Sequence, residues 1–434
     1  MDLRTRQAGI RRAVLLALAA ACGGGSKNDE DGADVPEALD DGGGGDDVAA
    51  DDPAVPDDGP GDDTVVPCST PLAARVRVTA VSVSPSSVEV TGGGFFSPFR
   101  PVILSPAADG TSRVAWTDGT GTVHVTPLDA ADARRGSDAT LDGEEVRGFV
   151  DLGDGGAVLV RRGDVMALVR LDGAGAEAFT LDIVGGTSHD VDGARWIDDW
   201  SHEGRLAWSG SQFAAYFGQT GNHGSAGNHQ GDRLTLVDPA GALASGGWDW
   251  GCSHSLDVRL AWNGSMFGPV CLSDCYPGKG IYFNHSSLVR EEPSGDCSGF
   301  SDASLGGLVP AAGGFWLSFT SREGRGSSDV GLVHIAANGS TGSVMFLTET
   351  AGTDETGAHL ARYGENFLAG WYDGASPTLA VVSESGGMVE GPVATDAQFA
   401  EKDDFITWPG GDVGWAYAWG DMTQLRIVRV SRCE

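Results

Sequence analysis

Short runs of alternating apolar and polar residues, separated by glycine-rich turns, make up most of the chain from residue 67 onward. Alternation with a period of two is the pattern of a β-strand that buries one face. The segments FAAYF (213–217), FWLSFTS (315–321) and FLAGWY (367–372) add the aromatic residues that are enriched in strands. No segment in this part keeps the 3.6-residue period of an amphipathic helix. The pattern therefore predicts an all-β fold.

The same pattern repeats along the chain. Residues 205–213 (RLAWSGSQF) and 259–267 (RLAWNGSMF) are identical at seven of nine positions and lie 54 residues apart. Weaker copies give seven units with a period of about 50 residues, which start near 101, 149, 205, 259, 307, 359 and 405. Each unit contains an apolar strand, a glycine turn, an aromatic strand and two further short strands. Four strands per repeat at this period is the pattern of a β-propeller blade.

The two ends of the repeat array complement each other. The last unit has only three strands and ends in QLRIVRV (424–430), whereas RVRVTAVSV (75–83) precedes the first unit and belongs to none. Pairing of these segments would complete the last blade and remove the exposed strand edges. We therefore predict a seven-bladed β-propeller over residues 67–434, in which the N-terminal strand completes the last blade and closes the ring. Cys68 and Cys433 flank the two segments, and we expect a disulfide between them.

The first 22 residues have the layout of an export signal. Four arginines precede a nine-residue apolar run, 13–21, which is too short to span a bilayer. The run ends in LAAAC (18–22), which resembles a bacterial lipobox, although Ala19 stands where that motif usually has leucine. The resemblance implies that Cys22 is acylated and becomes the mature N-terminus. Ordinary signal-peptidase cleavage nearby, which gives a soluble protein, is the alternative.

Residues 23–66 contain fifteen acidic residues, one lysine and no aromatic residue. Such a segment buries too little apolar surface to offset the entropy of ordering it, so we predict an acidic, Gly/Asp-rich, disordered tether. The order of lipoprotein signal (1–22), tether (23–66) and propeller (67–434) resembles bacterial β-propeller lipoproteins in general. That resemblance implies a place in the cell envelope, on the outer membrane or the cell surface.

The net charge and the number of cysteines limit the possible binding partners and indicate the compartment. Residues 67–434 carry a net charge of −22, which remains of the total −33 after +3 from residues 1–22 and −14 from residues 23–66 are removed. This excess of acidic residues argues against binding to nucleic acid and against direct binding to anionic lipid. We therefore expect contact with the membrane only through the lipid anchor. We also expect a monomer. Six cysteines besides Cys22 suit an oxidising compartment. Four of them cluster near the fourth unit, and their three pairings stay open, as does a Cys/His metal site: Cys252, Cys271, Cys275 and Cys297.

The alternation of strand direction places the long loops of all blades on one face. These loops are 185–204, 218–232, 248–258, 273–280, 291–306, 321–329 and 395–404. Four histidines of the third and fourth blades fall in them and form the predicted metal or polar-ligand site: His202, His223, His229 and His254. Neutral imidazoles suit Zn or Cu, but no tight spacing such as H-E-x-x-H is present, so an organic ligand and plain solvated loops remain alternatives.

Further ligand-binding residues are expected near these loops. Trp248 and Trp250 form either a sugar-stacking platform or part of the core. Arg205 and Arg259 are expected to line the central channel, where they pair with aspartate, such as Asp257, or bind an anion. We expect a lipid-anchored binding module for a polar ligand, a glycan, a protein or a metal. A hydrolase or lyase acting on extracellular glycans, with catalytic residues unassigned, and a structural envelope protein are the alternatives.

Anchoring can be tested directly. Labelled palmitate should be incorporated into the wild-type protein but not into the Cys22→Ser variant, because the lipobox hypothesis makes the Cys22 thiol the acylation site. The variant should also be recovered as soluble protein. Equal labelling of both proteins would contradict the hypothesis that Cys22 is the acylated residue of a lipobox.

Overall fold

The computed structural model describes residues 69–89, 102–185, 188–201, 203–291, 303–322 and 324–433, all within the unit Val66–Glu434. Besides strands, these residues contain the four-residue helix α2 (Leu72–Arg75) and the 3-10 turn η1 (Gly224–Ala226). The prediction of an all-β fold is therefore confirmed. The predicted signal segment, the tether and Cys68 lie outside the described residues. Within the described ranges, no helix has the length and apolar character to cross a bilayer.

Four antiparallel sheets are each built from four consecutive strands. The first contains β2 (Val102–Pro106), β3 (Ser112–Thr117), β4 (Thr122–Leu128) and β5 (Ala139–Asp142). The second contains β6 (Glu145–Asp151), β7 (Gly156–Arg162), β8 (Val165–Leu171) and β9 (Glu177–Val184). The third contains β19 (Ser304–Ala311), β20 (Gly314–Ser321), β21 (Asp329–Ala336) and β22 (Met345–Phe346). The fourth contains β23 (Glu355–Tyr363), β24 (Asn366–Asp373), β25 (Ser376–Val382) and β26 (Met388–Ala394).

A nine-stranded sheet covers the two most similar repeats. Its strands are β10 (Arg195–Trp196), β11 (Gly204–Trp208), β12 (Phe213–Asn222), β13 (Asn228–Val237), β14 (Leu243–Trp248), β15 (Ser253–Trp262), β16 (Phe267–Tyr276), β17 (Gly280–Phe283) and β18 (Ser287–Glu291). One residue pair, Gly231 with Ser253, joins β13 to β15 and so links the two repeats.

The remaining sheet combines both ends of the described chain. It contains β27 (Ile406–Thr407), β28 (Val413–Trp419) and β29 (Gln424–Val430), together with β1 (Val76–Ser82) from the N-terminal side. β1 pairs antiparallel with β29 along seven consecutive residue pairs, from Val76–Val430 to Ser82–Gln424. The segment expected to supplement the three-stranded last repeat therefore pairs with it. Cys433 is disulfide-bonded, but its pairing with Cys68 stays a prediction because Cys68 lies outside the described residues.

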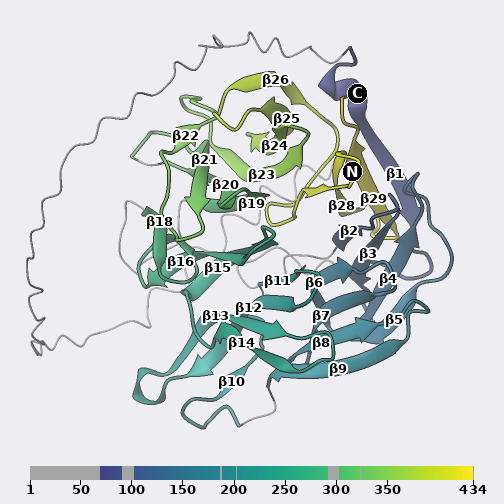
Figure 1. The fold of residues 1–434 in the computed structure, drawn as a ribbon, viewed down its shortest axis with the longest axis vertical. Helices are drawn as coiled ribbons and strands as arrows, with labels where there is room; N and C mark the ends of the chain where they lie inside the picture. Colours follow the sequence, from purple (N-terminus) through teal and green to yellow (C-terminus); the bar gives the residue numbers. More distant parts are fainter. Residues whose placement is uncertain are drawn as a thin grey trace, which may run out of the picture. The chain divides into compact units, whose positions relative to one another are not determined.

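The sheets follow one another in chain order around the middle of the view (Figure 1). The first strands of successive sheets touch: β2 contacts β6, β6 contacts β11, and β11 contacts β15. The series continues from β15 to β19, from β19 to β23, and from β23 to β27, and β27 contacts β2. These first strands contain or adjoin the seven predicted unit starts.

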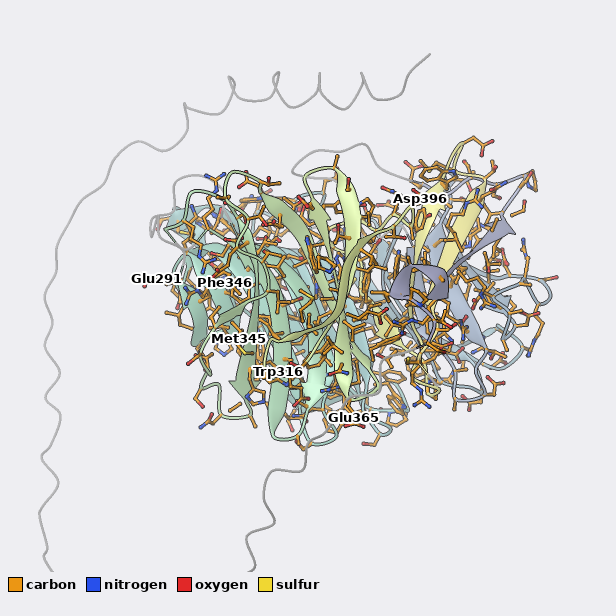
Figure 2. The ribbon with its side chains drawn as sticks, turned by 90° about the horizontal axis from the view of Figure 1, so that it is seen from above. Glu291, Trp316, Met345, Phe346, Glu365 and Asp396 are labelled. Atoms are coloured by element: carbon orange, nitrogen blue, oxygen red, sulfur yellow. A yellow bond between two sulfur atoms is a disulfide. The ribbon has the colours of Figure 1, made fainter. Side chains whose placement is uncertain are left out.

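The described residues form seven buried apolar clusters: six lie between neighbouring sheets, and one lies between the two repeats of the nine-stranded sheet. In one of them, Val81 of β1 and Ile427 of β29 pack with Trp116 of β3, so the supplemented sheet is joined to the sheet after it. In another, the partly buried Trp316 and Met345 pack against the cluster between the third and fourth four-stranded sheets (Figure 2). Apolar contact between sheets is therefore the main source of packing.

Several predicted loops contain strand residues: 253–258 of the predicted loop 248–258 belong to β15, and 273–276 of the predicted loop 273–280 belong to β16. The predicted loop 218–232 is a further case. Residues 218–232 were expected to form a loop because they are rich in glycine and polar residues, but β12 runs to Asn222 and β13 starts at Asn228. A Cβ at Gly221 or Gly231 would lie 2.8 or 2.6 Å from the Trp250 ring. The glycines therefore make room for an indole against the strand pair instead of interrupting it.

A buried carboxylate ties the supplemented sheet to the next one. Asp132, in the connection after β4, is fully buried and accepts hydrogen bonds from the guanidinium of Arg429 at 2.5 and 3.1 Å. Its Oδ2 also lies 2.5 Å from Nη2 of Arg77 on β1. One carboxylate thus holds β1 and β29 together from a neighbouring sheet.

Removing this charge should destabilise the fold. The Asp132→Asn variant keeps the side-chain shape and tolerates the positive φ of 64° at this position. It removes the nearer and fully buried counter-charge of Arg429 and leaves only the Asp412 carboxylate, 3.8 Å from Nη1. We expect the free energy of unfolding to fall by about 3–5 kcal/mol in urea titrations. Asp354→Asn, which removes a half-exposed partner of Arg322, is the control and should cost less than about 1 kcal/mol. Equal effects of the two substitutions would contradict the role given to Asp132.

Candidate functional site

The first strands approach closely because glycine occupies several of their positions. A Cβ at Gly148 on β6 would lie 2.6 Å from the Cβ of Leu206 on β11, and a Cβ at Gly307 on β19 would lie 2.2 Å from the carbonyl oxygen of Leu360 on β23. Neighbouring first strands therefore bring their charged residues within reach of one another. Seven charged residues meet there and are called the inner-strand ion cluster: Glu203, Arg205, Asp257, Arg259, Glu401, Lys402 and Asp404.

The two arginines of the strongest repeat lie at the centre of this cluster. Arg205 and Arg259 are 2% and 1% exposed. Arg259 forms an ion pair of 2.6 Å with Asp257 and donates to the carbonyl oxygens of Gly306 and Leu305 at 2.6 and 3.1 Å. The backbone of β19 therefore holds the Arg259 guanidinium in place.

Arg205 makes a corresponding set of contacts. Its Nε lies 3.1 Å from the Asp404 carboxylate, and its Nη2 donates to the Lys402 carbonyl oxygen at 2.8 Å. Its Nη2 also lies 3.8 Å from Asp257. The expected pairing of these arginines with aspartate is thus present, and Asp257 lies between the two guanidinium groups.

Sequence reasoning missed the acidic and basic residues that complete the cluster. Glu203, fully buried at the start of β11, accepts a 2.6 Å charged hydrogen bond from Nζ of Lys402. Glu401 is exposed, yet the surrounding protein raises the pKa of its carboxyl through loss of hydration, against the effect of Lys402. The only sequence signal for these residues was the run of charges directly before the first strand of the last unit.

Asp257 has a raised pKa because burial disfavours its charged form, and this effect outweighs the attraction of Arg259 and Lys402. Asp404 keeps 27% of its side chain exposed, and so provides an edge of the cluster that solvent reaches. Two buried carboxyl groups, two guanidinium groups, one ammonium group and two carboxyl groups near solvent are therefore concentrated in one place.

His359 on β23 is a further buried titratable group beside the cluster. Its Nδ1 lies 2.6 Å from the Gly357 carbonyl oxygen and its Nε2 lies 3.0 Å from that of Ala400. Two carbonyl oxygens would favour a protonated ring, but burial, with the positive charge of Arg259, lowers the pKa of His359 to about 4. Burial dominates because the ring is fully enclosed, so His359 is neutral near pH 7.

The predicted tryptophans are half-buried, and neighbours already pack on their rings. Trp248 lies 4.7 Å from the His285 ring and 6.1 Å from the Tyr216 ring. The Arg195 guanidinium lies 4.9 Å over the Trp250 ring, and His223 meets that ring edge to face at 4.5 Å. These contacts favour the packing alternative for Trp248 and Trp250.

Three of the four predicted histidines come together. His229 Nδ1 lies 3.4 Å from His254 Nε2, and the His223 ring lies 5.8 Å from the His229 ring. Strand β13 carries His229, β15 carries His254, and His223 immediately precedes η1. His202 lies outside the described residues. We call His223, His229 and His254 the histidine cluster.

Two of the four predicted cysteines, Cys252 and Cys271, form a buried group with Asp232. The Cys252–Cys271 disulfide settles one pairing, and Cys275 is also disulfide-bonded, whereas Cys297 lies outside the described residues. Asp232 lies within 4.8 Å of both sulfurs of this disulfide. Burial raises the pKa of Asp232 to about 7, and Tyr216 donates to it at 2.5 Å. Bonded sulfurs are not thiolate ligands, so this group is not a metal site.

No protein-family model matches the chain, and no curated protein matches it. Among solved structures, the chain is similar to a Penicillium chrysogenum α-L-arabinanase complexed with arabinobiose, with 11% identity, 81% of this chain and 97% of that chain covered, and a TM-score of 0.44. It is also similar to a Mycobacterium tuberculosis puromycin-hydrolyzing peptidase, with 13% identity, 77% and 53% covered, and a TM-score of 0.45. The AfRom2 CNH domain gives 10% identity, 82% and 99% covered, and a TM-score of 0.41. The structural neighbours thus include a glycosidase and a peptidase, and at this identity the likeness concerns the fold alone.

The low pKa of His359 predicts a specific loss of stability in acid. The folded pKa of about 4 lies below the usual histidine pKa of about 6.5, so the unfolded chain takes up the proton first. The contribution of neutral His359 is complete above pH 6.5 and is lost as the pH falls through about 4. Between pH 7.5 and 4.5, wild-type protein should lose about 2–3 kcal/mol more than His359→Gln in urea unfolding. Identical pH slopes in the two proteins would contradict the neutral, enclosed state of this ring.

Proposed function

We propose that the chain is a lipid-anchored cell-envelope protein whose working domain is a seven-bladed β-propeller closed by β1. The circuit of contacts through the first strands, from β2 to β27 and back to β2, supports the ring, and so does the pairing of β1 with β29. The apolar run and lipobox-like LAAAC before the acidic segment support export and anchoring through Cys22. The acidic segment 23–66 then serves as the tether.

We propose that this domain binds a neutral glycan at the inner-strand ion cluster. The observation that carries this proposal is the concentration of buried charge where first strands of different sheets meet. Arg205, Asp257 and Arg259 lose the hydration of their charges when they are buried. Apolar side chains at the same positions would not carry this cost. Ionisable groups with perturbed pKa values inside a fold are most often found at functional sites.

The chemistry of the cluster selects the ligand class. Carboxylates accept hydrogen bonds and guanidinium groups donate them, so the cluster can satisfy hydroxyl groups, which do both. Asp404 and Glu401 are the members within reach of solvent. A net charge of −22 on residues 67–434 repels polyanions. A neutral, polyhydroxylated ligand therefore suits the cluster better than an anionic one.

A second function, hydrolysis of the bound glycan, is favoured by one observation. Loss of hydration raises the pKa of Glu401, whereas Asp404 lies 3.1 Å from Arg205 and 3.5 Å from Arg259. Glycosidases use such a pair, in which one carboxyl group holds a proton for the leaving group and the other stays ionised. In this function Glu401 is the proton donor and Asp404 the ionised partner.

One set of variants tests both functions. Wild-type protein should bind members of a neutral glycan array, and Asp404→Asn should weaken binding at least about tenfold, because one charged hydrogen bond contributes about 1.5–3 kcal/mol. If the protein also hydrolyses the glycan, Glu401→Gln should retain binding and lose the hydrolysis. Glu384→Gln, which breaks a half-exposed ion pair between Glu384 in the turn after β25 and Arg362 on β23, is the matched control and should change neither property.

Three results would separate the alternatives. Binding without release of reducing ends supports the binding module alone. Binding that survives Asp404→Asn unchanged contradicts the assignment of the site. Absence of binding across the array leaves the structural role in the envelope as the better explanation.

A further inference from the structure

The histidine cluster lies outside the inner-strand ion cluster, and its geometry depends on two paired strands. The pair Gly231–Ser253 joins β13 to β15 near their starts. His229 lies two residues before this pair on β13, and His254 lies one residue after it on β15, so the two histidines are close together. At His254 the register between β15 and β16 shifts, and its backbone adopts a φ of 52°. Bulges of this kind redirect a side chain and are frequent beside functional sites. The bulge turns His254 toward His229.

Hydrogen bonding fixes which nitrogens face each other. His229 Nε2 lies 3.0 Å from the Ala226 carbonyl oxygen, which can only accept, so Nε2 carries the hydrogen. His229 Nδ1 therefore presents a lone pair to His254. His254 Nδ1 lies 3.2 Å from Oδ1 of Asp274, which favours a hydrogen on Nδ1 and a lone pair on Nε2. Two lone pairs then face each other across 3.4 Å.

A cation between these nitrogens resolves the conflict. The 3.4 Å separation is long for a hydrogen bond, whose usual length is about 2.9–3.0 Å. Two nitrogens bound to one tetrahedral zinc ion at 2.0–2.1 Å are about 3.3–3.4 Å apart. Zn²⁺ and Cu²⁺ both accept imidazole nitrogen. The separation therefore fits a shared metal ion better than a shared proton.

The surroundings have the features of groups that orient metal ligands. Histidine ligands usually donate their other ring nitrogen to a carbonyl oxygen or a carboxylate, and Ala226 and Asp274 occupy these positions. Asp274 Oδ1 is buried, and Nδ1 of the His254 ring lies 3.2 Å from it. Trp200 packs 5.4 Å from the His254 ring and provides apolar cover.

We propose that His229 Nδ1 and His254 Nε2 are two ligands of a Zn²⁺ or Cu²⁺ ion, and that Asp274 and the Ala226 carbonyl orient the two rings. The other coordination positions are filled by water or by an added ligand, so the site is open. His223 lies beside the pair, and its Nε2 is buried without a hydrogen-bond partner. Its position near Gly221, opposite His229 in the β12–β13 ladder, makes it the nearest further imidazole.

Metal titration of the full chain tests this site. Protein stripped with a chelator and then titrated with Zn²⁺ alone, or Cu²⁺ alone, should bind one equivalent tightly by calorimetry. His229→Ala and His254→Ala should each weaken that equivalent at least tenfold. Asp274→Asn should weaken it by about 10–100-fold, as is usual for a group that orients a metal-bound histidine.

His189→Ala is the matched control. His189 lies in the connection between β9 and β10. Like His254 it has a carboxylate beside it, Asp164 at 3.3 Å, and an aromatic ring against it, Trp196. It does not belong to the histidine cluster. Its removal should leave the affinity unchanged. The acidic segment 23–66 is present in every variant, so weak binding by its carboxylates cancels in the comparison.

Electron paramagnetic resonance of the Cu²⁺ form gives a readout that does not depend on the stability of the variants. Wild-type protein should show coupling to at least two imidazole nitrogens, and each single alanine variant should lose one of them. Absence of nitrogen coupling in wild-type protein overturns the proposal. So does equal affinity of wild-type protein and His229→Ala, or a loss in His189→Ala as large as that in His254→Ala.

Discussion

The antiparallel pairing of β1 with β29 is the contact on which the rest of the arrangement depends. Every other sheet pairing in the described residues joins strands that are close in sequence, whereas this ladder joins residues 76–82 to residues 424–430. Its formation covers an edge of β29 that would otherwise expose unpaired backbone groups. Asp132 adds a buried ionic tie between these two strands and the following sheet. The first and last strands of the described residues are therefore held by hydrogen bonds, apolar contact and charge together.

With the sheets held by apolar clusters between them, the first strands are free to carry charge. Six of the seven clusters lie between neighbouring sheets, and large aromatic side chains such as Trp415 and Phe315 fill two of these. The first strands therefore do not need to provide the apolar packing that holds the sheets together. Arg205 and Arg259 occupy equivalent repeat positions there, and backbone carbonyls and aspartates compensate both guanidinium groups. Their burial is tolerated because the backbone of β19, the connection before β27 and two aspartates together satisfy both guanidinium groups.

The sequence predicted what local patterns determine and missed what depends on contacts across units. Alternation and the repeated RLAW motif located the strands and the equivalence of Arg205 and Arg259. The partners Lys402 and Asp404 lie almost 200 residues from Arg205 in a segment without repeat similarity, so only the folded arrangement brings them beside that arginine. The Cys252–Cys271 pairing likewise depends on adjacent strands. The long β12–β13 ladder was missed because its glycines accommodate Trp250, a contact distant in sequence.

The histidine cluster lies where the chain departs from its own repeat. β12, β13 and β15 are ten residues long, and the pair between β13 and β15 fuses two units into one sheet. The bulge at His254 and the short connection at 223–227 then set imidazoles on strands rather than on loose loops. Rigid strands hold ligand atoms at fixed separation, which a metal ion requires and a solvated loop does not provide. In this chain the regular repeat supplies the scaffold, and its irregular unit supplies the geometry for chemistry.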